Sequence, residues 1–285
     1  MPSEPRKRYR SDLTDPQWEL LQDLIPKPRK SSKGGRPRAV EMRDVVNTIL
    51  YPCRSGCQWD MLPHDLLPKS TVYDYFARWR DDGTWQRINE TLVGAIRQLE
   101  ARSEEVKPSA ASIDSQSVKT SERSATRGYD GGKKITGRKR NIAVDTLGLL
   151  LAVAVTIASV DDAFAARPVL KQLTQVQQPN LQIVWADSKY HNHALNSWMS
   201  RQKDIHWKLE VVRRPKGAQG FVLLPKRWVV ERTFSWLGRW RRLSRDYEHH
   251  TESSEAMVHV ASIGRMLRRL APTGDQPPFR YRLTT

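Results

Sequence analysis

Residues 141–158, NIAVDTLGLLLAVAVTIA, carry the clearest structural signal in this 285-residue chain. Apolar and polar side chains alternate over residues 141–146, Gly148 follows, and the chain is then almost entirely apolar as far as Ala158. Alternation, a glycine turn and a second apolar segment predict a β-hairpin. The apolar run is too short for a membrane helix, which needs roughly 20 residues, so it predicts a buried strand.

Elements of an α/β fold surround this hairpin on both sides. The predicted elements are a strand at 110–118, a helix at 163–175, a strand at 181–186, a helix at 193–201, a strand at 206–213 and a helix from 227 to about 247. This order predicts a mixed sheet with helices flanking its faces.

The first hundred residues show helical periodicity throughout. Helices are predicted at 13–24, capped by Thr14, at 41–51, at 70–80, capped by Ser70 or Thr71, and at 85–99. The polar segment 101–110 separates this region from the strands. We therefore predict an all-helical domain at 1–105, an α/β domain at 106–272 and a tail at 273–285.

The chain is strongly basic, with a formal net charge of +17. Such an excess indicates a polyanionic partner, either nucleic acid or an anionic membrane surface. Residues 1–12 lack the apolar core of a secretory signal, so nucleic acid in the cytoplasm is the expected partner, with no membrane association. Two cysteines, Cys53 and Cys57, are too few for a disulfide framework or a four-ligand zinc site.

Three carboxylates stand at positions that suit a metal site. Asp114 lies within the 110–118 strand, Asp187 follows the 181–186 strand, and Glu231 lies one turn into the basic helix. If the two strands are parallel neighbours, their aspartates converge, and a helix packed across them adds the glutamate. Three clustered carboxylates repel one another unless a cation neutralises them. Oxygen ligands without His or Cys favour Mg²⁺ or Mn²⁺, and two such ions can clamp a phosphodiester.

Spacing alone does not single out these three residues, because a chain with 31 acidic residues offers many such triples that are helix caps or surface ion pairs. Glu231 is distinctive because it is the one acid among ten Lys and Arg between residues 213 and 245. A simple pairing of Glu231 with Arg227 and Arg232 remains the alternative. Elsewhere, Asp145 is predicted to face solvent, and Asp161 and Asp162 to cap the helix that follows them. The alternative for either of these two aspartates is a supporting contact to the metal ligands.

Basic residues elsewhere form two candidate DNA contacts. The glycine-rich segment 119–140 leaves the Asp114 strand with eight basic residues and two acids, and as a loop it would contact phosphates or simply be solvated. In the helical region, the 70–80 helix is either a recognition helix or a core helix, and the GGRPR stretch suits a minor groove. The residues are Lys119, Lys133, Lys134, Arg138 and Lys139 in the segment, and Ser70, Thr71, Arg78, Arg36 and Arg38 in the helical region.

Six stretches of the sequence are distinctive: SIDSQSVKT (112–120), WADSKY (185–190) and RWVVERTFSWLGRWRRLSRDYE (227–248), together with LTDPQWELLQDLIP (13–26), GGRPR (34–38) and STVYDYFARWRDDGTWQRI (70–88). These stretches resemble those of DDE transposases of short bacterial insertion sequences, in the large group numbered family five within a wider family-four-like superfamily. The resemblance covers nearly the whole chain.

The resemblance implies a ribonuclease-H-like catalytic domain preceded by a helical, helix-turn-helix-like DNA-binding domain. It implies that Asp114, Asp187 and Glu231 are the catalytic, metal-binding residues, with two Mg²⁺ or Mn²⁺ ions and a homodimer in the DNA complex. Arg227 and Glu231 fit the signature around the third acid. Leu224 stands at its Tyr position and Gly238 at its Lys position, so the adjacent Arg239 is the candidate for the DNA contact of that Lys.

The expected function is therefore that of a DNA transposase in the bacterial cytoplasm, associated with the nucleoid. It would cut double-stranded DNA at terminal inverted repeats and transfer the strand into target DNA, while Arg227 and Arg232 offset phosphate charge. Two alternatives remain: a non-catalytic, sequence-specific DNA-binding protein, such as a repressor or decayed transposase, and a ribonuclease-H-like nuclease that cuts without joining.

Overall fold

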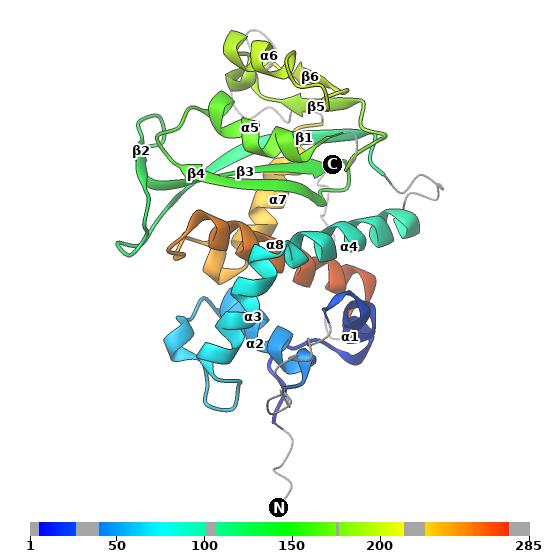
Figure 1. The fold of residues 1–285 in the computed structure, drawn as a ribbon, viewed down its shortest axis with the longest axis vertical. Coiled ribbons are helices and arrows are strands. Elements are labelled where there is room, and N and C mark those ends of the chain that lie inside the picture. The colour runs from blue at the N-terminus through cyan, green and yellow to red at the C-terminus, as the bar shows by residue number, and fades with distance from the viewer. Residues whose placement is uncertain (1–5, 27–39, 101–106, 175–176, 214–225, 274–285) are drawn as a thin grey trace, which may run out of the picture.

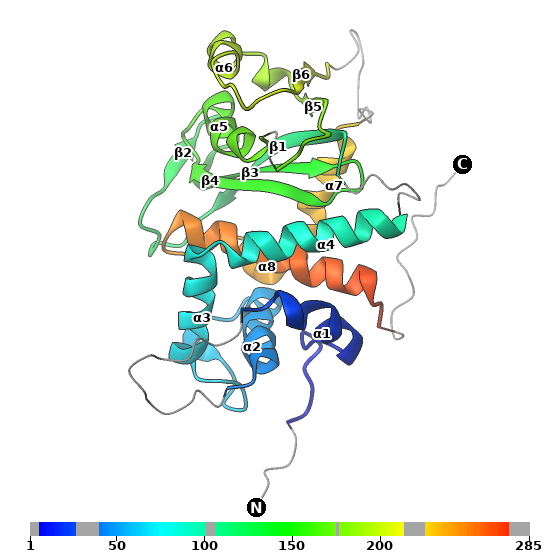
Figure 2. The same ribbon diagram turned by 45° about the vertical axis from the view of Figure 1, so that its right-hand side comes forward.

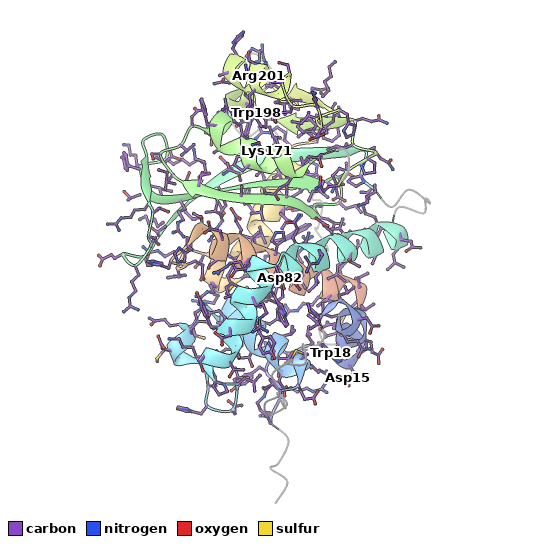
Figure 3. The ribbon with its side chains drawn as sticks, viewed as in Figure 1. Asp15, Trp18, Asp82, Lys171, Trp198 and Arg201 are labelled. Atoms are coloured by element: carbon purple, nitrogen blue, oxygen red, sulfur yellow. The ribbon has the colours of Figure 1, made fainter. Side chains whose placement is uncertain are left out.

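The computed structural model describes residues 6–26, 40–100, 107–174, 177–213 and 226–273. The molecule is elongated, with the N-terminal helices at one end and the sheet towards the other (Figure 1). Asp15 and Trp18 mark the helical end, and Trp198 and Arg201 mark the far end beyond the sheet (Figure 3). Asp82 lies between these ends, where it accepts a hydrogen bond from the Thr84 backbone N–H (3.0 Å).

Four α-helices and two short 3₁₀ turns build the N-terminal region. They are α1 (Asp15–Leu21), η1 (Gln22–Leu24), α2 (Met42–Ser55), η2 (Trp59–Met61), α3 (Lys69–Asp81) and α4 (Thr84–Glu100). Thr14 caps α1 as predicted, in a capping box with Gln17. The prediction for α3 was wrong by a residue or two: Pro68 precedes the helix, so Ser70 and Thr71 lie inside its first turn.

Six strands form one mixed sheet. They are β1 (Ala110–Lys119), β2 (Gly128–Asp130), β3 (Ile135–Asp145), β4 (Leu150–Ile157), β5 (Ile183–Ala186) and β6 (Lys208–Val211). The predicted hairpin is β3–β4, and Gly148 in its turn has φ +78°, a left-handed conformation that suits glycine. The short strand β2 and the extension of β3 back to Ile135 were not predicted.

The strand order is that of the ribonuclease-H-like fold. β4, β3 and β1 are antiparallel neighbours, and β1 continues into the parallel pairs β1–β5 and β5–β6. β2 extends the edge of the sheet by pairing with the first residues of β3. The predicted α/β fold, with a mixed sheet preceded by helices, is therefore confirmed.

Helices cover both faces of this sheet (Figure 2). α5 (Asp162–Gln172) packs on β3 and β4 on one face, whereas α4, α7 (Trp228–Gly238) and α8 (Thr251–Leu270) lie on the other. α6 (His193–Met199) and the 3₁₀ turn η3 (Ser188–Tyr190) follow β5. The predicted basic helix is shorter than expected because it ends at Gly238, before the 3₁₀ turn η4 (Arg241–Leu243).

The last helix, α8, connects the two regions. It packs against α1, α2, α3 and α4 and also against β4. A continuous apolar core consequently runs from Leu13 in the helical region to Leu267 in α8. Gln17 adds a polar link by donating a hydrogen bond to the Ala271 carbonyl (2.9 Å). The domain boundary at residue 105 stays a prediction. Helix α8 packs against both the helical region before this boundary and the sheet after it.

Asp145 is buried, and the prediction that it faces solvent was wrong. Its carboxylate accepts hydrogen bonds from the backbone N–H groups of Leu147 (2.9 Å) and Leu149 (2.8 Å), which shape the β3–β4 turn. It also pairs with Arg97 of α4 at 2.8 Å. Alternation along the strand predicted an exposed Asp145 because one face of an isolated hairpin would be open to solvent. In the structure, α4 and α8 cover that face.

Candidate active site

Two neighbouring parallel strands bring Asp114 and Asp187 together. β1 pairs with β5 in a register that aligns Ser112 with Trp185. Two residues further along each chain, Asp114 is level with Asp187. Asp114 accepts a hydrogen bond from the backbone N–H of Ser115 (2.7 Å), and Asp187 accepts one from the backbone N–H of Lys189 (2.8 Å). Both carboxylates are therefore held by the chain directly after them, and each side chain is 19% exposed.

Glu231 reaches the same place from α7, which packs on β1 and β3. Val230, Phe234 and Leu237 form the buried face of this helix, at the spacing predicted. Glu231 lies beside this buried face, in the first turn, with its side chain 51% exposed. Its exposure leaves the third carboxylate open to a ligand.

Arg227 joins all three carboxylates. Its Nη2 atom lies 3.5 Å from Asp114 Oδ2, 3.8 Å from Asp187 Oδ2 and 3.9 Å from Glu231 Oε1. Any two of these oxygens are consequently less than about 8 Å apart. Arg227 is itself 8% exposed, and its Nε is buried without a hydrogen-bond partner. Three acids far apart in the sequence thus meet around one guanidinium.

The pKa of Asp114 reflects this setting. Burial raises it from the usual range to about 6, and the negative charge of Asp187 adds to the rise. The Ser115 N–H, Arg227 and Lys133 oppose the change without cancelling it. A carboxyl that is costly to ionise next to a second acid gains from any cation placed between them.

The donor set fits a hard divalent ion, since it consists of carboxylate oxygens. In the present conformation, the described part of the chain contains no group of three acidic, His or Cys side chains compact enough to enclose a metal ion. Arg227 places a positive charge within 4 Å of an oxygen of each of the three carboxylates.

Three of the predicted basic contacts are exposed, and one of them, Lys133, lies near the site. Lys133 donates a hydrogen bond from Nζ to the Ser115 carbonyl (3.3 Å), and Lys119 ends β1. Lys134 follows in the β2–β3 turn, with φ +53°. All three side chains are exposed, which is consistent with a contact to DNA phosphates.

The prediction that placed Arg138 and Lys139 in an exposed loop was wrong, because both are buried in β3. Arg138 pairs with Asp246 (3.4 Å) and donates to the carbonyls of Glu248 (2.9 Å) and His249 (2.6 Å). Lys139 pairs with Asp162 at 2.9 Å. These contacts hold both side chains in the interior and not on the surface.

Arg232 also has a structural environment. Its guanidinium lies 4.3 Å from the ring centroids of both Trp228 and Trp236, and it donates to the Leu147 carbonyl (3.2 Å). It is half-buried, whereas Arg239 at the end of α7 is exposed. Of the two, Arg239 is the better placed for the predicted DNA contact.

The helical region keeps its predicted contacts on the surface in part. Ser70 and Arg78 of α3 are exposed and Thr71 is half-buried, while Val72, Phe76 and Trp79 fill the core. α3 is thus a core helix with one free face. Arg36 and Arg38 lie outside the described residues.

Asp162 lies near the site, where the sequence had left a supporting contact open as the alternative to helix capping for Asp161 or Asp162. Asp161 caps α5 as predicted, by accepting from the Ala163 N–H (2.9 Å). Asp162 instead turns towards β1 and β3, where it pairs with Lys139 and Lys189 and accepts from Ser115. Capping is therefore correct for Asp161, and Asp162 makes the alternative contact.

A ribonuclease-H-like sheet with two aspartates on adjacent parallel strands and a glutamate on a covering helix defines the DDE class of nucleic-acid enzymes. The chain belongs to the transposase DDE domain family, whose model matches residues 105–263. A second family, described as a putative transposase of the IS4/5 family, matches residues 13–89.

Individual proteins show more distant similarity. A putative transposase for insertion sequence element IS402 from Burkholderia cepacia is 30% identical over 136 residues, which cover 44% of this chain and 60% of that protein. The chain thus spans less than two thirds of the curated relative that it matches. A solved Mos1 mariner paired end complex with Mn aligns at 11% identity with a TM-score of 0.29, over 89% of this chain and 83% of that one. Among the described residues, no helix is long and apolar enough to cross a membrane.

Proposed function

We propose that this protein is a DNA transposase whose catalytic residues are Asp114, Asp187 and Glu231. The observation that supports this assignment is the meeting of the three carboxylates around Arg227, within 4 Å of one nitrogen atom. Membership of the transposase DDE domain family supports the same reaction class. Terminal inverted repeats and target DNA are the proposed substrates, with two copies of the chain acting together in the bacterial cytoplasm at the nucleoid.

The proposed reaction has two steps. In the first, the oxygen of a water molecule bonds to phosphorus at the element end, and the bond from phosphorus to the 3′ oxygen breaks, leaving a 3′-hydroxyl and a 5′-phosphate. In the second, that 3′ oxygen bonds to a target phosphorus, and the target's own 3′ oxygen leaves and takes up a proton. The second step conserves the number of phosphodiester bonds, so it needs no external energy source.

Asp114, Asp187 and Glu231 would hold the divalent ions, which we propose are two Mg²⁺ or Mn²⁺. When bound, such ions polarise the phosphate and lower the pKa of water. Arg227 keeps the three carboxylates together and, once they turn to a cation, can pair with the DNA phosphate. Lys119, Lys133, Lys134 and Arg239 would align the backbone around the cut, and α3, with Ser70, Thr71 and Arg78, would bind the element end together with Arg36 and Arg38.

Cleavage of a DNA duplex that carries an element end tests this function. The Asp114→Asn and Glu231→Gln variants should retain DNA binding in a gel-shift assay and lose cleavage. Asp161→Asn is the matched control, because asparagine also caps a helix, and it should cleave like the wild type. Cleavage by both site variants at the wild-type rate would contradict the proposal.

A pre-cleaved end separates the alternatives. A transposase joins the 3′-hydroxyl of this DNA end to target DNA, whereas a simple nuclease cuts DNA but does not join the end. A repressor or decayed copy binds the end and neither cuts nor joins. Loss of joining in Asp114→Asn together with joining by the wild type would assign both steps to the same site.

A further inference from the structure

The carboxylate of Asp162 receives contacts from three separate elements. Ser115 of β1 donates from Oγ to its Oδ1 (2.7 Å), and the Nζ of Lys139 in β3 lies 2.9 Å from the same oxygen. The Nζ of Lys189 in η3 lies 3.4 Å from Oδ2. The Asp162 side chain is 11% exposed, so these groups replace most of its contact with water.

Two of these partners also hold the catalytic aspartates. Ser115 donates its backbone N–H to Asp114, and Lys189 donates its backbone N–H to Asp187. Each residue thus uses its main chain for one catalytic carboxylate and its side chain for Asp162. Asp162 is the common acceptor that connects the two.

Lys139 is the third partner of Asp162. Its ammonium group is buried and also donates to the Val160 carbonyl, just before α5 (2.7 Å). Tyr190 is a further neighbour: burial, followed by the charges of Asp114, Asp162 and Asp187, raises the pKa of its hydroxyl well above the usual value. The hydroxyl of Tyr190 therefore lies in the field of Asp162 and both catalytic aspartates.

Helix capping does not account for Asp162. The cap of α5 is made by Asp161, which accepts from the Ala163 N–H. The contacts of Asp162 described above run to β1, β3 and η3, away from its own helix.

We propose that Asp162 is a positioning residue that sets the separation of Asp114 and Asp187 through Ser115 and Lys189. The inference rests on the proposed function, in which these aspartates bind the metal ions. Partners that orient metal ligands typically contribute a factor of about 10–100 in metal affinity.

The test is Mn²⁺ binding to the full-length protein without DNA, measured by isothermal titration calorimetry. Asp162→Asn keeps the size of the side chain but removes the charge that holds Lys189, and it should weaken Mn²⁺ binding roughly 10-fold or more. Ser115→Ala and Lys189→Met each remove one arm and should weaken binding by less. Asp161→Asn, one residue away, should bind like the wild type.

A second measurement separates positioning from general loss of structure. In DNA cleavage, Asp162→Asn should require more Mn²⁺ for half-maximal rate and recover most of the wild-type rate at saturating Mn²⁺. The double variant Asp162→Asn with Lys139→Met removes both buried charges. It keeps the test valid if the single variant does not fold, since it leaves no unpaired ammonium in the interior.

Asp114→Asn makes the two kinds of failure distinguishable. If Asp114→Asn loses Mn²⁺ binding while Asp162→Asn, Ser115→Ala and Lys189→Met all bind like the wild type, the positioning role is wrong and the proposed function stands. If Asp114→Asn also binds Mn²⁺ like the wild type, the metal site of the proposed function is wrong.

Discussion

The guanidinium of Arg97 in α4 lies 2.8 Å from the carboxylate of Asp145 at the end of β3. Both side chains are largely buried, with 11% and 0% of their surfaces exposed. This ion pair connects the helical region to the hairpin of the sheet, and the same carboxylate shapes the hairpin turn.

Replacing Arg97 should therefore destabilise the whole fold. Arg97→Met leaves the buried Asp145 without its counter-ion, which should lower the free energy of unfolding by about 3 kcal/mol or more. Urea denaturation followed by circular dichroism measures the change. Arg87→Met is the control, because Arg87 is 62% exposed and 3.8 Å from Asp82, and its loss should change little. If both variants changed the free energy of unfolding equally little, the Arg97–Asp145 pair would not stabilise the fold.

Arg227 and a divalent ion should compete for the same carboxylates. Arg227→Gln removes the positive charge between them, so Mn²⁺ should bind more tightly to the protein alone, while cleavage should fall because a phosphate contact is lost. Calorimetry with Mn²⁺ and a cleavage assay check the two effects separately. Weaker Mn²⁺ binding by Arg227→Gln would mean that the guanidinium mainly orders the carboxylates.

Glu255 in α8 should make stability depend on pH. Burial raises the pKa of its carboxyl from 4.5 to about 7, although its side chain accepts a hydrogen bond from the Val155 N–H (2.7 Å). Because the folded pKa is raised, the stability that protonated Glu255 provides is present below pH 4.5 and is lost as the pH rises towards 7.

The variant Glu255→Gln keeps the hydrogen-bond acceptor and cannot ionise. It should match the wild type near pH 4.5 and be more stable above pH 7 by up to about 3 kcal/mol. Denaturation curves at several pH values measure the difference. The control Glu252→Gln should keep most of the wild-type dependence, and a constant offset for Glu255→Gln at all pH values would contradict the assignment.

Gly137 should not tolerate a side chain. A Cβ at this position would lie 1.9 Å from the Val118 carbonyl oxygen in the neighbouring strand. Gly137→Ala must therefore separate β1 from β3 and should cost about 3 kcal/mol of stability. Gly131→Ala in the adjacent turn meets no atom within 4 Å and should be near neutral. Thermal unfolding of both variants makes the comparison.

The sequence predicted the hairpin and the three acids for identifiable physical reasons. Residues 141–146 alternate and the run after Gly148 is apolar, and neither pattern has the periodicity of a helix. These residues form parts of β3 and β4. Asp114 lies within one short strand, Asp187 directly follows another, and Glu231 is the one acid among the ten basic residues between 213 and 245. Their meeting depended on the β1–β5 pairing, which could only be assumed from the sequence and which the structure contains.

Other features depended on contacts that span the whole chain. Arg138 and Lys139 looked exposed because their acidic partners, Asp246 and Asp162, are distant in the sequence. The helix α8 was not predicted, since it is buried between two layers and has no single apolar face. Asp145 was predicted to face solvent because the sequence did not show that α4 covers that face of the hairpin.

The position of α8 bears on synthesis of the protein at the ribosome. Trp18 and its neighbours in α1 emerge well before α8, yet Gln17 bonds to Ala271 and Arg268 bonds to the Arg10 carbonyl. The growing polypeptide must leave α1 incompletely packed until α8 has been translated. A nonsense mutation shortly before codon 250 would remove α8 and leave the N-terminal helices without the surface on which they pack, so such a fragment should be cleared by proteases instead of persisting as a separate DNA-binding product.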